Sequence, residues 1–451
     1  MDILILSRIQ FALTIMFHYI YPPMSIGLGL IIVIMESMYM ITKKPLYHQM
    51  TKFWVKMFGL NFAIGVATGI VMEFEFGTNW STYSRYVGDV FGSALAAEGV
   101  FAFFLESGFL AILLFGWDKV SPLMHWVAAL LVCLGAHFSA VWIVVAGSWM
   151  QTPAGYHIVG EGIHARAEIT DFWAMVFNPS SMERLSHVLI AAWSTGAFFI
   201  LSVSAYYLLK KRHVEFAKIS MRIALIVALI ATVAQLITGR ISAEGVAQRQ
   251  PTKLAAMEGH YPANEPADLY LFGYVDEKAR EVQYGIKIPG MLSFMIHGDN
   301  KAPVQGINAF KKEDMPPVNI VFQAYHVMVA IGVFLILLTV VCLVYLWRGR
   351  LFETTWLLRI LVPSVLLPQI ANQLGWMAAE VGRQPWIVWG LLRTSEGLSK
   401  AVKANQVMTS LVMFTVIYLL LFVLYIFLFD SKIKHGPEDG SADASADTHR
   451  A

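Results

Sequence analysis

Eight side chains that can titrate or bind iron lie within, or at the ends of, long apolar runs of this chain. They are His18, Glu98, Glu106, His187, His326, Met328, Glu380 and Arg383. An ionisable group in hydrocarbon costs several kcal/mol unless it is paired or coordinated, so each of these residues is a candidate for function. Histidine, methionine and carboxylate side chains hold haem iron and move protons. This combination points to a membrane-embedded redox protein.

The composition excludes several other classes of protein. Hydrophobic residues make up 57% of the 451 residues and charged residues only 14%, which is too apolar for a soluble globular protein. The net charge of +2, without a basic patch interleaved with aromatic residues, predicts no nucleic-acid partner. Cys133 and Cys342 lie in apolar runs and are expected to be buried thiols rather than a disulfide. No CxxCH motif occurs, so any haem is held without thioether links.

Nine apolar runs are long enough to cross about 30 Å of hydrocarbon as helices. They are residues 11–38, 53–76, 93–116, 125–149, 185–208, 218–239, 320–346, 356–379 and 406–429. The predicted fold is therefore an all-α integral membrane protein, a bundle of about nine transmembrane helices. Lysine and arginine cluster after the first, fifth, seventh and ninth runs, which places the N-terminus outside and the C-terminus in the cytoplasm. The connection 381–405 carries four cations on the predicted outer side and breaks this charge rule, which is understandable if those cations bind something.

Composition divides the chain into four parts. Residues 1–239 form the first six spans and carry candidates for iron ligation and proton transfer, and residues 320–435 form the last three and carry the remaining candidates. Between them, residues 240–319 are polar and rich in Gly and Pro, and such long loops are usually functional or disordered. The acidic, low-complexity tail 436–451 is expected to be disordered.

Counting spans converts the candidate residues into a geometry. With 1.5 Å rise per residue, His18, His187, Met328 and Glu380 all fall within about 15 Å of the outer face, on the same side as the long loop. Glu98 and Glu106 lie eight residues apart on one span, so we expect their directions to differ by about 80° and Glu106 to lie roughly 12 Å deeper. Haem sites in helical bundles are built from ligands on separate helices at one depth.

The same residues also permit a less specific interpretation. A single intramembrane histidine is more often hydrogen-bonded inside the protein than a ligand, and His137 has the same claim as His18. Methionine commonly fills gaps in a core, and this chain has 22 of them. The three glutamates could pair with cations on neighbouring spans. From the residues alone, a multi-haem or proton-coupled membrane protein and a transporter with a charged core both remain open.

Several long motifs carry a resemblance that separates these alternatives. They are LSRIQFALTIMFHYIYPPMSIGL, TKFWVKMFGLNFAIGVATGIVMEFEFGTNWSTYSRYVGDVFG, EGVFAFFLES, LGAHFSAVWIVVAGSWMQTPAG, TKLAAMEG and GWMAAEVGRQPW. The chain closely resembles cytochrome bd quinol oxidase subunit I in these motifs, which are distributed from residue 4 to about residue 430. The loop after residue 258 is much shorter than in long-loop members, so the resemblance is to a short quinol-loop form.

The resemblance implies two haem b groups, one low-spin and one high-spin, and a haem d. His187 and Met328 correspond to the axial pair of the low-spin haem b, and two strong ligands suit electron transfer because they leave no open position. His18 and Glu380 correspond to the axial ligands of the two high-spin haems, without deciding which residue serves which haem.

Further roles follow from the same resemblance. Glu98 corresponds to a carboxylate beside the high-spin pair, Glu106 to a proton-path residue and Trp376 to an aromatic residue near the haems. Lys253 and Glu258 match loop residues used in quinol oxidation, although in isolation such a pair would be assigned to solvated surface.

Arg383 and His326 both lie near the predicted haem sites. Arg383 could pair with haem propionates. His326 stands where many relatives have an arginine, so contacts of that arginine with propionate or quinol do not carry over, and the pH dependence could differ because histidine titrates near neutrality.

The implied protein is the haem-bearing subunit of a terminal respiratory oxidase in the bacterial cytoplasmic (inner) membrane. It would oxidise membrane quinol at the outer face and reduce dioxygen to water, which separates charge without pumping. Cytochrome bd oxidase subunit II is the implied partner, and the resemblance also leaves room for a small single-span accessory subunit. Two alternatives stay open: a bd-like electron-transfer haem protein that does not reduce oxygen, and a haem-free membrane transporter.

Overall fold

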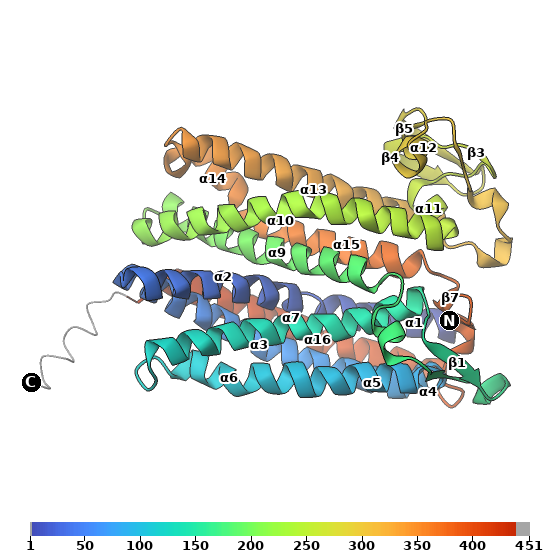
Figure 1. The fold of residues 1–451 in the computed structure, drawn as a ribbon, viewed down its shortest axis with the longest axis horizontal. Coiled ribbons are helices and arrows are strands. Elements are labelled where there is room, and N and C mark those ends of the chain that lie inside the picture. The colour runs from blue at the N-terminus through green and yellow to red at the C-terminus, as the bar shows by residue number, and fades with distance from the viewer. Residues whose placement is uncertain (1, 439–451) are drawn as a thin grey trace, which may run out of the picture.

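The computed structural model describes residues 2–438 and contains, within them, nine helical segments long and apolar enough to span a membrane (Figure 1). The predicted all-α bundle is confirmed at this level. The helices of the nine segments are α1 (Ile3–His18) with α2 (Tyr21–Thr42), α3 (Pro45–Thr78), α5 (Gly88–Glu98) with α6 (Phe104–Phe115), α7 (Pro122–Gln151), α9 (Ser181–Leu209), α10 (Val214–Arg249), α13 (Val318–Trp347), α14 (Thr355–Leu361) with α15 (Leu366–Val381), and α16 (Ala404–His435). The predicted tail 436–451 lies almost wholly outside the described residues.

The helices extend beyond the apolar runs that predicted them. The first span begins at Ile3 rather than residue 11, and α10 continues to Arg249 rather than residue 239. Apolar runs mark the length needed to cross hydrocarbon, whereas the backbone hydrogen bonds of a helix continue into polar residues beyond it. The first span is also two helices: α1 ends at His18, and α2 begins at Tyr21 with Pro22 in its first turn, where a missing N–H costs nothing.

The long polar segment between α10 and α13, residues 250–317, folds into a small unit that we call the cap. It contains α11 (Pro251–Glu258), β3 (Glu265–Pro266), β4 (Leu269–Asp276), β5 (Glu281–Ile288), α12 (Met291–His297) and β6 (Pro303–Val304). Strands β4 and β5 pair as an antiparallel hairpin, and β3 pairs with β6. The cap lies at the end of the bundle at which α1 begins, beside α13, and α16 ends at the opposite end (Figure 1).

Smaller elements fill the other connections at the cap end. They are α4 (Ser81–Tyr86), β1 (Tyr156–Val159) paired with β2 (Arg166–Ile169), α8 (Phe172–Val176), and β7 (Trp386–Val388) paired with β8 (Leu392–Arg393). The sheets are each two-stranded and lie outside the spans.

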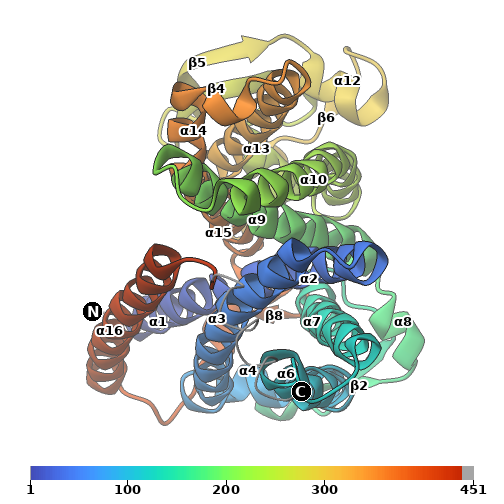
Figure 2. The same cartoon turned by 90° about the vertical axis from the view of Figure 1, so that its left-hand side faces the viewer.

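Two groups of helices meet where α2 packs on α9. Along the helix axes, α9, α10, α13 and α15 lie on one side, and α2, α3, α6, α7 and α16 on the other (Figure 2). At the crossing, Gly27 lies against Gly196: a Cβ on Gly196 would be 2.3 Å from the carbonyl carbon of Gly27. Only glycine permits this backbone contact. The main apolar core, with Trp54, Phe58 and Phe198 fully buried, surrounds this crossing.

Candidate functional site

His18 ends α1 with its ring against α3. Its Nδ1 lies 3.0 Å from the Thr68 hydroxyl, which itself donates to the carbonyl of Ile64 at 3.0 Å. The next residue, Gly69, lies beneath the ring: a Cβ at that position would be 3.2 Å from His18 Cε1. A threonine and a glycine on the facing helix therefore hold this histidine from one side.

His187, on α9, has the same arrangement against α10. Its Nδ1 lies 3.0 Å from the Thr238 hydroxyl, and the hydroxyl donates to the carbonyl of Ala234 at 3.1 Å. Gly239 follows, and a Cβ there would be 3.6 Å from His187 Cε1. In addition, the amide nitrogen of Gln235 lies 2.9 Å from His187 Nε2.

Met328 comes from α13 and packs against α15. A Cβ on Gly375 would lie 2.8 Å from the Met328 sulfur, so the absence of a side chain at that residue makes room for the thioether. Trp376, the next residue on α15, is half-buried. Helix α13 packs on α10 and α15, and both of these pack on α9, so the helices bearing His187 and Met328 belong to one group.

Glu380 lies in a buried polar network beneath the cap, which we call the cap network: Gln151, Gln250, Lys253, Glu380 and Arg383. The carboxylate of Glu380 accepts from Gln151 Nε2 at 2.9 Å and forms an ion pair with Arg383. The Lys253 ammonium donates to the side-chain oxygens of Gln151 and, at 2.7 Å, of Gln250. Gln151, at the end of α7, thus connects the cap lysine to Glu380.

Lys253 and Glu258 are buried, which rules out the alternative of solvated surface. Only 1% of Lys253 and 2% of Glu258 is exposed. Burial lowers the pKa of Lys253 well below its usual value, and Arg184 lowers it further, while Glu380 opposes the shift. Burial raises the pKa of Glu258 to about 7, against the opposing hydrogen bond from Tyr325.

The two cap residues face different helices although both lie on α11. Lys253 points into the cap network, while Glu258 meets Tyr325 of α13. One oxygen of Glu258, Oε2, is buried without a partner among the described residues. A buried carboxyl group with an unused oxygen and a pKa near neutrality can exchange a proton with a small molecule.

His326 connects α13 to the cap. Its two ring nitrogens lie 2.9 Å from the carbonyl oxygens of Phe322 and Tyr270, the latter on β4. Carbonyl oxygens only accept hydrogen bonds, so both contacts are hydrogen bonds when both ring nitrogens carry a proton. In that form His326 is a donor only, as an arginine at this position would be. Beside His326, an apolar cavity of about 450 Å³ opens between β4 and α13, with Gln323 as the other polar residue of its lining.

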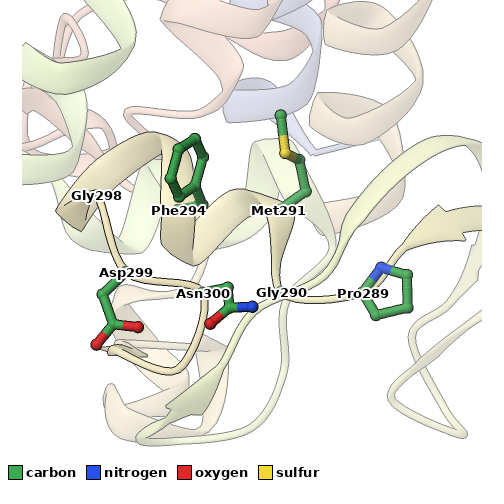
Figure 3. A pocket seen from close by; sticks show the side chains of 7 residues that line it. All are labelled: Pro289, Gly290, Met291, Phe294, Gly298, Asp299 and Asn300. Atoms are coloured by element: carbon green, nitrogen blue, oxygen red, sulfur yellow. The ribbon is translucent and has the colours of Figure 1, made fainter.

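A second hollow, of about 420 Å³, lies entirely within the cap (Figure 3). Residues 289–300 form it, and Asp299 and Asn300 are its polar side chains. None of the sequence-predicted site residues lines it.

Glu98 and Glu106 both lie against α7. Ser139 donates to Glu98 at 2.5 Å, and one turn earlier on α7 a Cβ on Gly135 would lie 2.9 Å from Glu106 Cβ. The expected 80° offset is wrong because Gly99–Phe103 between them forms a π-helical turn. A wider turn advances fewer degrees per residue, which brings the two carboxyl groups to one face.

His137, the rival of His18 by position, has both ring nitrogens occupied. Its Nδ1 lies 2.8 Å from the carbonyl of Cys133, and its Nε2 accepts from Trp193 at 3.0 Å. This pattern is that of a hydrogen-bonded interior histidine. The structure thus separates two histidines that sequence position alone could not.

Sequence reasoning missed the residues that hold the candidates in place. They are Thr68, Gln151, Thr238, Gln250 and Tyr325. A repeated Thr-Gly pair, in ATGI and ITGR, was the available signal for two of them. Gln151 stood in the quoted SWMQTPAG motif, but nothing in its local sequence indicates a partner on α15 or α11.

Comparisons with known proteins agree over almost the whole chain. The family model described as cytochrome bd terminal oxidase subunit I matches residues 6–437. The chain is 41% identical over 448 residues to cytochrome bd ubiquinol oxidase subunit 1 of Bacillus subtilis, covering 97% of this chain and 95% of that protein. It is 35% identical to cytochrome bd-II ubiquinol oxidase subunit 1 of Escherichia coli, covering 97% of each.

A solved structure is also similar. The bd oxidase from Geobacillus thermodenitrificans superposes with a TM-score of 0.90 at 31% sequence identity, covering 97% of this chain and 99% of that one. The similarity therefore extends over the spans and the cap together.

Proposed function

We propose that this chain, which belongs to the cytochrome bd terminal oxidase subunit I family, oxidises quinol beside its cap and carries the haems that reduce dioxygen to water. Family membership implies haems, and two relatives that match over almost their whole length are named ubiquinol oxidase subunits. The observation that supports the proposal best is that His18 and His187 are each held through Nδ1 by a threonine on the facing helix. Their Nε2 atoms are thereby directed to a ligand.

The residues present fit haem iron. His187 and Met328 lie on α9 and α13 of one helix group, and they would hold a low-spin haem b once the Gln235 amide rotates off His187 Nε2. His18 and Glu380 would hold the high-spin haem b and haem d. The Glu380 carboxylate already accepts two hydrogen bonds, but a carboxylate has about four acceptor positions, so it retains capacity for a metal. When bound, the haems supply the iron that carries electrons and binds oxygen.

Quinol oxidation must remove two protons with the two electrons, and the cap supplies a proton acceptor. We assign this role to Glu258, whose pKa of about 7 lets it take a proton and release it near neutral pH. Lys253, held by two amide oxygens, fixes α11 over the cap network, and we assign to it a hydrogen bond to a quinol oxygen. The apolar cavity between β4 and α13 is suited to the hydrophobic part of a quinol.

Protons for water would reach the haems along α6 and α7. Glu106 is buried, and Glu98 lies on the same side toward the cap end of the bundle. We assign Glu106 and then Glu98 as successive proton carriers, with Trp376 packed near the haems and Arg383 beside their propionates. His326 keeps the cap attached to α13.

The proposed setting is the bacterial cytoplasmic membrane, with the N-terminus and cap outside and the C-terminus inside. Quinol protons would leave on the cap side while protons for water enter from the other, so charge is separated without pumping. The "subunit 1" in the names of the relatives implies a subunit II partner, and a small single-span chain could accompany it.

A reduced-minus-oxidised absorption spectrum of the purified complex tests the proposal. A chlorin band at the red end together with haem b bands is the expected result. Haem b bands alone would instead indicate a quinol-linked electron-transfer protein. A spectrum without a Soret band would leave only a haem-free transporter.

A further inference from the structure

We propose that Thr68 and Thr238 are positioning residues that fix the tautomer of His18 and His187, so that Nε2 is the atom offered to haem iron. This inference rests on the haem ligation proposed above. It assigns a task to two residues of the bundle interior that neither donate nor accept a proton in the reaction.

The hydroxyl group of each threonine has a single proton, and that proton is already in use. Thr68 lies 3.0 Å from the carbonyls of Ile64 and Gly65, and Thr238 lies 3.1 Å from the carbonyl of Ala234. Threonines inside helices commonly donate to the carbonyl four residues earlier. Because a carbonyl cannot donate, the hydroxyl must be the donor in these bonds, and only its lone pairs face the histidine.

The histidine must therefore supply the proton of the shared bond. At 3.0 Å from a hydroxyl that can only accept, Nδ1 of both rings carries hydrogen. In a neutral imidazole the other nitrogen, Nε2, then holds the lone pair that binds a metal. Ligating histidines usually donate their second N–H to such an outer partner, which fixes the ring and makes the ligand more basic.

The amide nitrogen of Gln235 lies close to both ring nitrogens of His187, at 2.9 Å from Nε2 and 3.1 Å from Nδ1, so the threonine alone distinguishes the two tautomers. The glycine after each threonine completes the arrangement. Gly69 and Gly239 let the facing helix approach the ring edge, at 3.2 and 3.6 Å from a hypothetical Cβ to Cε1.

Other buried histidines of the bundle lack this arrangement. His137 bonds its own helix through Nδ1, and Trp193 already occupies its Nε2. His125 contacts Glu36 through Nδ1, at 2.5 Å, and the carbonyl of Leu113 through Nε2. A threonine-glycine pair on the facing helix is thus found at the two histidines proposed as ligands and not at these two.

The test compares Thr238→Val with a matched control on the same helix. Thr232 is also buried and donates to the carbonyl four residues earlier, Ala228, at 2.7 Å, but it meets no histidine. In the purified complex, Thr238→Val should retain low-spin haem b but shift its midpoint potential to more positive values, because a less basic imidazole stabilises ferric iron less. Thr232→Val should leave the potential unchanged, and Thr238→Ser should restore it.

The same design applies on α3, where Thr51 is buried, donates to Tyr47 and serves as the control for Thr68. Thr68→Val should alter the high-spin haem spectrum and its carbon monoxide difference spectrum, and Thr51→Val should not. The proposal would be overturned if Thr238→Val kept the wild-type midpoint potential and Thr68→Val kept the wild-type spectra. His187→Ala tests the haem ligation separately from the role of the threonine. If this variant kept the low-spin haem, the assignment of His187 as a ligand would be wrong.

Discussion

The histidine sites of the bundle and the cap network bury polar groups in opposite ways. His18 and His187 are each held by one hydroxyl whose own proton is already committed, so geometry decides their state. The cap region buries Lys253, Glu258 and Arg383, and the half-buried Glu380 pairs with Arg383. There the balance of charge and desolvation decides protonation, as the shifted pKa values of Lys253 and Glu258 indicate.

This difference separates two kinds of task. A site governed by geometry keeps one ligand atom directed at iron whatever the pH, which suits electron transfer. A site governed by charge changes its protonation near neutrality, which suits the release of protons from quinol. Substitutions that change side-chain shape at the histidine sites should therefore affect the haem spectra. Substitutions that change charge in the cap should affect the pH dependence of quinol oxidation and leave the haem spectra nearly unchanged.

Met328→Leu should have the largest effect on the bundle side. Leucine keeps the volume and apolar character of methionine, so packing against Gly375 should survive while the thioether ligand is lost. The low-spin haem b should become high-spin or be absent from the purified complex, as read from the absorption spectrum. An unaltered low-spin spectrum would show that Met328 is not a ligand.

Glu258→Gln should have the largest effect on the cap side. Removing a proton acceptor should slow quinol oxidation by about 100-fold or more while all haem bands remain. In the wild type the rate should rise as pH increases through about 7, because Glu258 accepts a proton only when ionised. The variant should lose this rise. Haem loss in Glu258→Gln would contradict the separation between the two regions.

Glu106→Leu tests a residue of the bundle whose proposed role, proton transfer, depends on its charge and not on its shape. The haems and their reduction by quinol should remain, whereas oxygen turnover and the associated proton uptake should slow. We expect a smaller effect than at Glu258, because Glu98 on the same face of the helix remains as a carboxylate in the variant. Proton uptake at the wild-type rate would remove Glu106 from the path.

Gly69→Ala and Gly239→Ala should give the smallest effects, and unequal ones. An alanine methyl at residue 69 would lie 3.2 Å from the His18 ring, closer than an ordinary contact, and at residue 239 it would lie 3.6 Å from the His187 ring. Gly69→Ala should therefore shift the high-spin haem spectrum, and Gly239→Ala should leave the low-spin spectrum nearly unchanged. Equal shifts would mean that both glycines serve the same steric purpose.

Much of the fold followed from the sequence because the bilayer restricts it so strongly. A span needs a minimum length of apolar residues, and all nine predicted runs correspond to helical segments. The helix ends did not follow, since Ile3 and Arg249 are placed by backbone hydrogen bonds beyond the apolar runs. The two strand pairs of the cap were also missed, because short paired strands in a polar segment give a weak signal.

The candidate site divides in the same way. Side-chain type and family motifs identified His187, Met328 and Glu258, but their ligand and proton roles stay predictions until tested. The partners could not be predicted, because a threonine inside a helix usually serves only its own backbone. That Thr238 meets a histidine 51 residues away depends on how α9 and α10 pack. The π-helical turn at Gly99–Phe103 was equally invisible to a rule that assumes regular helices.

The backbone contact of Gly27 with Gly196 bears on how fast electrons can move between the haems proposed at His18 and His187. Gly27 lies on α2, which follows His18, and Gly196 lies on α9, nine residues after His187. Where side chains separate two helices, rotamer changes let the spacing vary, but two touching backbones cannot approach further. The glycine crossing thus acts as a fixed spacer between the two histidine-bearing segments. Electron tunnelling declines steeply with distance. A methyl group at Gly27 or Gly196 would push the two helices apart and should slow electron transfer between the proposed haems more than it alters either histidine site.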